Sequence, residues 1–272
     1  LEFDEDGDLA IDTPRFVELP VPFVLSKPPF GDYSPNMFEA YARAAHSLGT
    51  YFILDPDDYT KNLAPYKDAI APLVKGSQAS KHKSLIKGSK LVELVYDSKY
   101  KAGIKAIRKI EPEAVISVRL PIEEDSHILA ETLASEGIEV IHFFADNHGN
   151  VGPGAGGNGS EPEFIKDAFR RIHTHLVDTG LRDAVTLAAG GGIAMAEHMA
   201  KIIICGADFV SLGMPFLVAL ECRMCMNCTK GRECPVDISG VPPEYGAQRI
   251  LNLSASWRNQ LLEVLGAMGL RE

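Results

Sequence analysis

The chain has 272 residues, of which 46% are hydrophobic and 24% charged, and its formal net charge is −10. This size fits one large domain, such as an α/β barrel of about 200–250 residues, or two small ones. The acidic balance excludes a nucleic-acid partner, because such a surface needs clustered Lys and Arg. No apolar run reaches the roughly 20 residues of a membrane span, so no membrane partner is expected.

Short apolar runs alternate with helical patterns from residue 20 onwards, after an acidic and irregular arm at 1–19. Several runs are continuous rather than alternating, which is typical of parallel strands covered on both faces. The expected strands are 22–25, 51–54, 91–96, 114–120, 140–145, 185–189 and 208–212, with 70–76 as a weaker eighth.

Helical patterns separate these strands. Ser34 is expected to cap the first helix, with Pro35 at its first position and Gly49 at its end. Strand–helix alternation along the whole chain favours an α/β fold, and the number of units favours a (β/α)8 TIM-type barrel. The other expected helices are 98–110, 126–136, 161–178, 194–205 and a closing helix over 250–265.

Glycine-rich runs follow the last two expected strands. Gly190, Gly191 and Gly192 end one strand, and Gly213 with Met214 ends the next. In a barrel these are the loops after strands seven and eight, which recurrently bind phosphate, because glycines let backbone N–H groups approach closely. The pair predicts a phosphate-bearing cofactor, and the alternative is two ordinary tight turns.

A third glycine-rich run, at 152–157, formally matches G-x-G-x-x-G. The stretch from 146 to 160 is too long for a tight dinucleotide turn, so we interpret the run as a loop over the barrel mouth or a solvent loop.

Two polar residues stand inside apolar strands. Arg119 comes near the end of its strand and is expected to project at the carboxyl end of the sheet, where ligands bind; the alternative is a surface ion pair. His142 lies within Val-Ile-His-Phe-Phe and is expected to be a core histidine with satisfied polar atoms.

Four of the five cysteines form the run C-x2-C-x2-C-x5-C-P. Such clustering is what an iron–sulfur cluster needs, and the alternatives are a structural zinc site or disulfides. Free thiols fit a reducing compartment, so we expect a cytoplasmic protein. The expected ligands are Cys222, Cys225, Cys228 and Cys234.

Together these motifs resemble the FMN- and iron–sulfur-binding barrel domain of glutamate synthase, of archaeal or related type, in a shortened and divergent form. The resemblance is strongest from about residue 111 to 238 and rests on the glycine loops that run into the cysteines. It implies FMN with its phosphate on the glycine loops, Arg119 in place of a flavin-contacting lysine, and a first flavin-contacting loop that contains Phe30 and Gly31.

Departures from the family pattern carry further expectations. The additional Cys225 supplies a fourth thiolate, which favours a 4Fe-4S over a 3Fe-4S cluster. After residues 91–96 a loop and a strand of the family are expected to be missing or degenerate. No glutaminase or NADPH-binding domain is present, so electron-donor or amidotransferase subunits would be separate chains in a complex.

The expected organisation is an arm at 1–19, a flavin-type barrel at 20–221, a cysteine segment at 222–240 and a helical closure at 241–272. The resemblance implies an oxidoreductase subunit that passes electrons between a 4Fe-4S cluster and FMN. The alternative is a degenerate, non-catalytic barrel that keeps its cluster for structure or electron relay in a larger complex.

Overall fold

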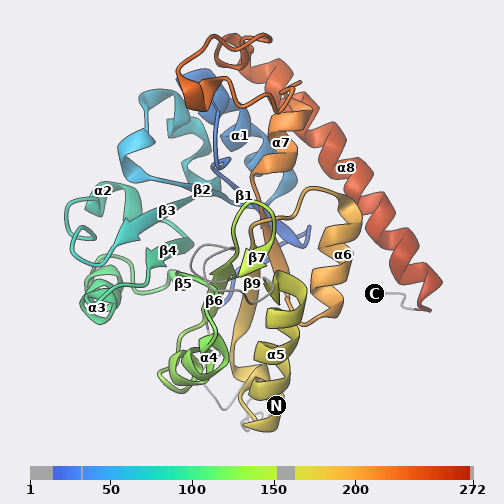
Figure 1. The fold of residues 1–272 in the computed structure, drawn as a ribbon. Coiled ribbons are helices and arrows are strands. Elements are labelled where there is room, and N and C mark those ends of the chain that lie inside the picture. Colours follow the sequence, from blue (N-terminus) through green and yellow to red (C-terminus); the bar gives the residue numbers. More distant parts are fainter. Residues whose placement is uncertain (1–14, 32, 152–162, 270–272) are drawn as a thin grey trace, which may run out of the picture.

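Eight parallel strands close into a barrel in the computed structural model, which describes residues 15–31, 33–151 and 163–269 (Figure 1). Around the barrel the strands follow chain order, and each pairs with its sequence neighbour until β10 closes on β1. The strands are β1 Phe23–Ser26, β2 Phe52–Leu54, β3 Ile70–Lys75, β4 Leu91–Val95, β5 Val115–Pro121, β6 Val140–Phe144, β9 Thr186–Gly190 and β10 Phe209–Leu212.

The closed barrel confirms the (β/α)8 prediction and corrects one part of it. The weak eighth strand is β3, which pairs with β2 on one side and with β4 on the other. The prediction of a missing or degenerate strand is therefore wrong, because the shortening after β4 leaves all eight strands in place. The glycine run 152–157 and residues 1–14 of the expected arm lie outside the described residues.

Helices surround the barrel, and most begin and end close to the sequence prediction. Between β2 and β3 the connection is made of 3-10 turns, Pro56–Asp58 and Lys61–Ala69. A small antiparallel ladder, β7 Asn150–Val151 with β8 Glu163–Phe164, lies before α5. The helices are α1 Pro35–Leu48, α2 Lys83–Ile86, α3 Tyr100–Ile110, α4 Ser126–Ser135, α5 Ile165–Asp178, α6 Ala196–Ile204, α7 Met214–Ala219 and α8 Pro243–Ala267.

Helix α1 has the ends that its sequence predicts. The Ser34 side chain accepts a hydrogen bond from the Met37 N–H at 3.2 Å, which satisfies one of the free donors of the first turn. Gly49 ends the helix with φ of 69°, a left-handed conformation that glycine adopts without strain. The helix buries Tyr41 completely, and the Tyr41 hydroxyl donates to the Gly213 carbonyl at 3.4 Å. Helix α1 is thereby tied to the loop after β10.

The interior of the barrel is filled by a cluster of buried apolar side chains to which every strand contributes. Such packing leaves the carboxyl ends of the strands for polar groups. One contributor from each strand is Val24, Ile53, Ala71, Leu91, Val115, Val140, Ala188 and Phe209.

Helix α8 is the long closing helix, with Trp257 almost fully buried, and it packs against α1, α6 and α7 (Figure 1). The cysteine segment connects α7 to α8 and lies at the top of the view in Figure 1. Among the described residues, no helix combines the length and the apolar character that crossing a membrane would need.

Candidate functional site

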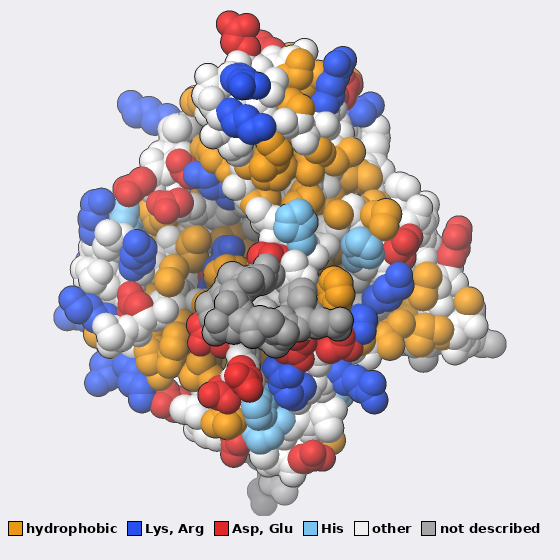
Figure 2. Space-filling model, viewed as in Figure 1, with side chains coloured by type: hydrophobic (Ala, Val, Ile, Leu, Met, Phe, Trp, Pro, Cys, Tyr) orange, Lys and Arg blue, Asp and Glu red, His pale blue; other side chains and the backbone are white. Residues whose placement is uncertain are grey.

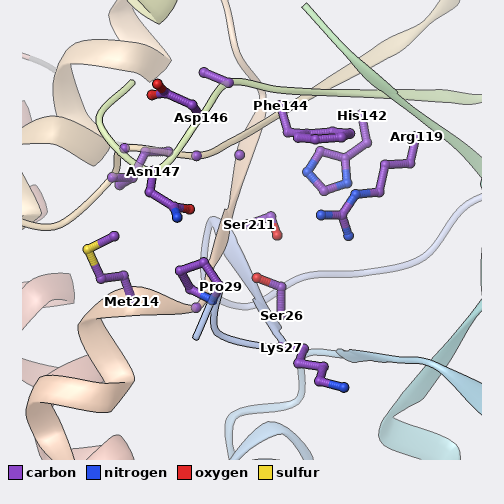
Figure 3. Close-up of a pocket in the computed structure, with 16 residues that line it drawn as sticks. Ser26, Lys27, Pro29, Arg119, His142, Phe144, Asp146, Asn147, Ser211 and Met214 are labelled. Carbon is purple, nitrogen blue, oxygen red and sulfur yellow. The ribbon is translucent and has the colours of Figure 1, made fainter. Parts of the chain in front are cut away.

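A cavity of about 310 Å³ lies at the carboxyl ends of the strands (Figure 3). This is the end of a (β/α)8 barrel at which active sites form, and the volume is at the small end of the range for small-molecule sites. Strand residues on its wall include Ser26 of β1, Arg119 of β5, His142 of β6, Gly190 of β9 and Ser211 of β10.

A buried ionic triad lies beside this cavity. Glu93 of β4 is 1% exposed, and its carboxylate pairs with Nδ1 of His142 and, at 3.4 Å, with Nη1 of Arg119. Strands β4, β5 and β6 are adjacent in the barrel, and Arg119 stands opposite His142 in the register. The parallel register thus assembles the three side chains from residues far apart in sequence.

The carboxyl of Glu93 stays ionised in this setting. Burial alone would raise its pKa, but the interactions with His142 and Arg119 outweigh burial and hold the pKa below its usual value. An ionised carboxylate accepts but cannot donate, so the ring nitrogen that faces it, Nδ1 of His142, carries a proton. The barrel interior therefore contains a carboxylate with two cationic or proton-donating partners.

Arg119 reaches from the triad into the cavity. Its guanidinium carbon lies 4.7 Å from the centre of the Phe144 ring, and its side chain keeps 26% of its surface exposed. Figure 3 shows Arg119 and His142 on the same side of the cavity, across from Ser26 and Ser211. The predicted place of Arg119 at the strand end is correct. Its ion pair is with a buried carboxylate rather than with a surface one.

His142 is buried, but the expectation that its polar atoms are satisfied is wrong at one nitrogen. Its Nε2 has no hydrogen-bond partner among the described residues. A Cβ on Gly190 would lie 2.8 Å from this nitrogen, so only glycine fits beside Nε2 at this position. The residue thus presents an unused hydrogen-bonding atom at the wall of the cavity.

The glycine run after β9 forms another part of the wall. Gly191 and Gly192 have φ of 89° and 66°, and a Cβ on either would lie 2.2–2.3 Å from backbone atoms of the loop after β6. Both residues line the cavity. Glycine is therefore required here for the close approach of two backbones and for the left-handed turn.

The loop after β10 and the loop after β1 meet at the cavity. Gly213 and Met214 line it, and a Cβ on Gly213 would lie 3.0 Å from the Lys27 carbonyl oxygen. Phe30 is buried in the hydrophobic core, and Gly31 lies beside Leu217 and Tyr33. From that first loop the cavity wall receives Lys27 and Pro29 instead.

An aspartate organises the loop after β6. The Asp146 carboxylate accepts hydrogen bonds from the backbone N–H groups of His148 and Asn150, both at 2.8 Å. Burial would raise its pKa, but these hydrogen bonds hold it below the usual value. Asp146 and Asn147 both line the cavity and come from a turn that this carboxylate fixes.

The cysteine segment starts one short helix away from the cavity. Helix α7 has six residues, about 9 Å of helix, and its first residue, Met214, lines the cavity. Cys222 follows the other end, where its N–H donates to the Leu217 carbonyl. Met224 donates its backbone N–H to the Cys222 sulfur at 3.4 Å. Cys222 and Cys228 are half-buried, and Cys225 is exposed.

Backbone strain is concentrated at the start of the cysteine segment. Glu221, Met224 and Met226 have φ of 70°, 54° and 58°, values that residues other than glycine rarely adopt. Burial, with smaller contributions from the neighbouring thiols Cys234, Cys225 and Cys228, raises the pKa of Cys222. In the part of the chain that the structure describes, no group of three or more His, Cys, Asp or Glu side chains is gathered closely enough to hold a metal ion.

Sequence reasoning missed Glu93 and the two serines of the cavity wall. A signal for Glu93 was available: it is the one charged residue in Leu-Val-Glu-Leu-Val, a run otherwise typical of a strand covered on both faces. A charge there must have partners inside the barrel. Ser26 and Ser211 gave no comparable signal, because small hydroxyl side chains are common at strand ends.

Comparison with known proteins places the chain in context. Residues 78–271, more than half of the chain, match the sequence model of a family described as a conserved region in glutamate synthase. The archaeal-type glutamate synthase [NADPH] of Thermotoga neapolitana is 26% identical over 99% of the chain and 64% of its own length. The archaeal glutamate synthase [NADPH] of Archaeoglobus fulgidus is 26% identical over 98% of the chain and 62% of its own length.

The chain therefore spans less than two thirds of the length of these relatives. Among solved structures, a mandelate oxidase variant described with a monooxide FMN adduct is similar, with a TM-score of 0.58 and 13% identity. The similarity covers 89% of this chain and 74% of that one, and at this identity it shows a shared fold.

Proposed function

Because this chain belongs to the glutamate synthase family, we propose that it is an oxidoreductase subunit in which a 4Fe-4S cluster and FMN exchange electrons. The single observation that carries the proposal is the cavity at the carboxyl ends of the strands, which combines the glycine loops with Arg119 and lies one short helix from the cysteine segment. FMN, when bound, supplies one-electron exchange with a cluster and transfer of a hydride equivalent.

The residues present fit an FMN phosphate. Gly191, Gly192, Gly213 and Met214 line one part of the cavity. Ile193, which leads into α6, also lines the cavity, and no side-chain cap closes the first turn of that helix. We propose that these loops hold the phosphate through backbone N–H groups.

The residues also fit an electron-rich ring. Arg119 is a permanent cation whose position is fixed by Glu93 and by the Phe144 ring. Its guanidinium is proposed to donate charge-assisted hydrogen bonds to the flavin edge that becomes negative on reduction. Phe30 and Gly31, which the resemblance assigns to a flavin-contacting loop, are proposed to support Lys27 and Pro29 on the cavity wall rather than to line it.

The thiols of the cysteine segment have the chemistry of iron–sulfur cluster ligands, although the structure does not gather them around one point. The neighbouring thiols contribute to the raised pKa of Cys222, and the left-handed residues between Cys222 and Cys228 turn the chain sharply within that short stretch. Local strain of this kind persists only when something over-determines it, and thiolate–iron bonds supply such a constraint. We propose Cys222, Cys225, Cys228 and Cys234 as the ligands of a 4Fe-4S cluster.

The alternative of a degenerate barrel with a purely structural cluster finds less support. The barrel is complete, and its carboxyl end keeps a cavity lined by charged and hydroxyl side chains rather than one filled by apolar residues. A barrel without a ligand would have no need of these groups in the positions they occupy.

Partners are proposed from the exposed side of the cysteine segment. Cys225 is exposed, and the apolar side chains of Met224 and Met226 beside it are 36% and 38% exposed. Figure 2 shows hydrophobic side chains gathered between the top of the molecule and the centre of the same face. We propose that an electron-donor chain approaches here, that an amidotransferase chain is a further separate partner, and that the complex works in a reducing compartment such as the cytoplasm.

Titration of the protein with FMN, followed by quenching of flavin fluorescence, tests the cavity proposal. The wild-type chain is expected to bind one FMN. Arg119→Leu is expected to weaken binding about tenfold or more, the equivalent of one charge-assisted hydrogen bond of about 1.5–3 kcal/mol. Arg223→Leu, a change at an exposed arginine of the cysteine segment, is the matched control. No quenching with the wild-type chain would contradict the proposal and favour the degenerate barrel.

Iron and acid-labile sulfide analysis of anaerobically purified protein tests the cluster. The proposal expects about four of each per chain, as the ligation of a 4Fe-4S cluster by four cysteines requires. Cys225→Ser is expected to lower both contents, whereas Cys205→Ser, which lies in the turn after α6, leaves them unchanged. Zinc without iron would overturn the cluster and leave the FMN proposal standing.

A further inference from the structure

His142 is a residue that neither the family resemblance nor the proposed flavin contacts use. The residue is 1% exposed and lines the cavity, and its buried Nε2 has no hydrogen-bond partner among the described residues. Burying an unpaired ring nitrogen costs free energy, so a ligand that forms a hydrogen bond with it removes this cost and binds more tightly. Only glycine fits at position 190 beside this nitrogen, because a Cβ there would approach to 2.8 Å.

Glu93 fixes which ring nitrogen of His142 carries a proton. The carboxylate accepts a hydrogen bond from Nδ1–H. The neutral ring therefore has a bare Nε2 that can accept a hydrogen bond, and the protonated ring has an Nε2–H that can donate one. Glu93 is buried and ionised, and it stabilises the imidazolium as the carboxylate of an acid–base dyad does. The dyad can therefore change its proton content at the cavity wall without moving.

Charged groups approach His142 from several elements of the barrel. The titratable and charged groups that face it or line the same cavity are Glu93 on β4, Arg119 on β5, Lys27 after β1 and Asp146 after β6. Strands β9 and β10 contribute Gly190 and Ser211, which carry no charge.

Most of these charges are already balanced. Lys27 pairs with Asp58 at 2.7 Å, and the charges of Glu93 and Arg119 offset each other. Arg119, which is proposed to face the flavin edge, shares its charge with Glu93, so negative charge that enters the cavity is countered only in part until His142 becomes an imidazolium.

We propose that His142 is a proton-accepting residue of the flavin site and takes up one proton at Nε2 when the bound flavin is reduced. This inference rests on the proposed function. The bond that forms is Nε2–H, with a proton from solvent, and the Nδ1–H bond and its contact with Glu93 are kept. The two electrons come from an external reductant and reside on the flavin, so His142 itself is neither oxidised nor reduced.

The test is the midpoint potential of the bound flavin, measured against pH during anaerobic reduction with dithionite. The potential of the wild-type protein is expected to fall more steeply with rising pH than that of His142→Asn. The difference in slope is expected to correspond to one additional proton taken up on reduction. Asparagine keeps a donor toward Glu93 and removes Nε2. His46→Asn, at an exposed histidine of α1, is the control and is expected to follow the wild type.

The outcomes separate the two proposals. Wild-type protein that binds no FMN overturns the proposed function and this inference with it. FMN that binds, with the same dependence of potential on pH in the wild type and His142→Asn, overturns this inference alone.

A second measurement needs no variant and remains decisive if His142→Asn fails to fold. ¹⁵N NMR of histidine-labelled wild-type protein is expected to show a neutral histidine with its proton on Nδ1 in the oxidised form, which gains a second ring proton on reduction. A proton on Nε2 of the oxidised form, or no change in any histidine on reduction, would overturn the proposal.

Discussion

At the scale of single residues, the sequence locates some groups of the site and misses their most consequential contact. Arg119 and the glycines can be placed at strand ends, because a parallel barrel brings every strand end to one face. The Glu93–His142 pair could not be predicted as a contact, since it depends on which inward-facing residues of β4 and β6 meet across β5. An acidic residue in one apolar strand and a basic residue in another nevertheless suggest that the two side chains pair inside the barrel.

The buried triad yields a prediction for stability. Glu93→Gln removes the charge shared by His142 and Arg119 and is expected to lower the free energy of unfolding by about 3–5 kcal/mol, as when one partner of a buried ion pair is lost. Urea unfolding at pH 7 measures it. Glu123→Gln, on the exposed turn before α4, is the control and is expected to stay within about 0.5 kcal/mol of the wild type.

The difference in unfolding free energy between the wild type and Glu93→Gln is expected to depend on pH. The folded-state pKa of Glu93 lies below the ordinary value, so its ionisation stabilises the fold above the unfolded-state pKa of about 4.3. This contribution is lost as pH falls through the folded pKa. The difference between wild type and Glu93→Gln is therefore expected to be full near neutrality and to shrink below about pH 4. A difference that stays constant down to pH 3 would contradict the ionised carboxylate.

At the scale of elements, local signals predicted helix α1 and every barrel strand to within one or two residues. The cap at Ser34 and the stop at Gly49 are encoded within a few positions. The connection between β2 and β3 was not predictable in this way, because Pro65 and the short 3-10 turns around it give no helical periodicity. The strand expected to be missing was a wrong inference from shortened loops, since loop length and strand number are independent.

The glycine loop after β9 gives a prediction at this scale. Gly192→Ala is expected to destabilise the protein and to weaken FMN binding, because its Cβ would lie 2.3 Å from the Gly149 backbone. Gly137→Ala is the matched control: its φ of 77° is also left-handed, but nothing lies within 4 Å of its Cβ. The control is expected to cost about 1–2 kcal/mol in unfolding free energy. Gly192→Ala should cost roughly 1–3 kcal/mol more from overpacking. Equal losses of stability and of FMN affinity would contradict the close approach.

At the scale of the whole molecule, the chain completes its barrel with β10, and the last helix, α8, then packs against the helices outside the barrel. The barrel class can be predicted from strand–helix alternation. The packing of α8 along α1 cannot, because an amphipathic pattern shows which side of a helix is buried but not which other helix it packs against. The cysteine segment is held between α7 and α8, so the closure of the fold also fixes the start and end of that segment.

This closure predicts that α8 unfolds together with the barrel. Trp257→Ala is expected to lower the free energy of unfolding by about 3–5 kcal/mol, the usual cost of removing a buried aromatic ring. Circular dichroism and tyrosine fluorescence should report one coincident transition. Leu262→Ala, on the exposed face of the same helix, should change little. A separate, early loss of helix signal would show that α8 is an independent unit.

The exchange of electrons between cluster and flavin is the central claim, and stopped-flow reduction of the FMN-loaded protein by a one-electron donor tests it most directly. The account predicts that the cluster absorbance bleaches first and the flavin band follows, and that Cys225→Ser loses the rapid flavin phase while still binding FMN. Flavin reduction at the same rate in the wild type and Cys225→Ser would contradict electron passage through the cysteine segment.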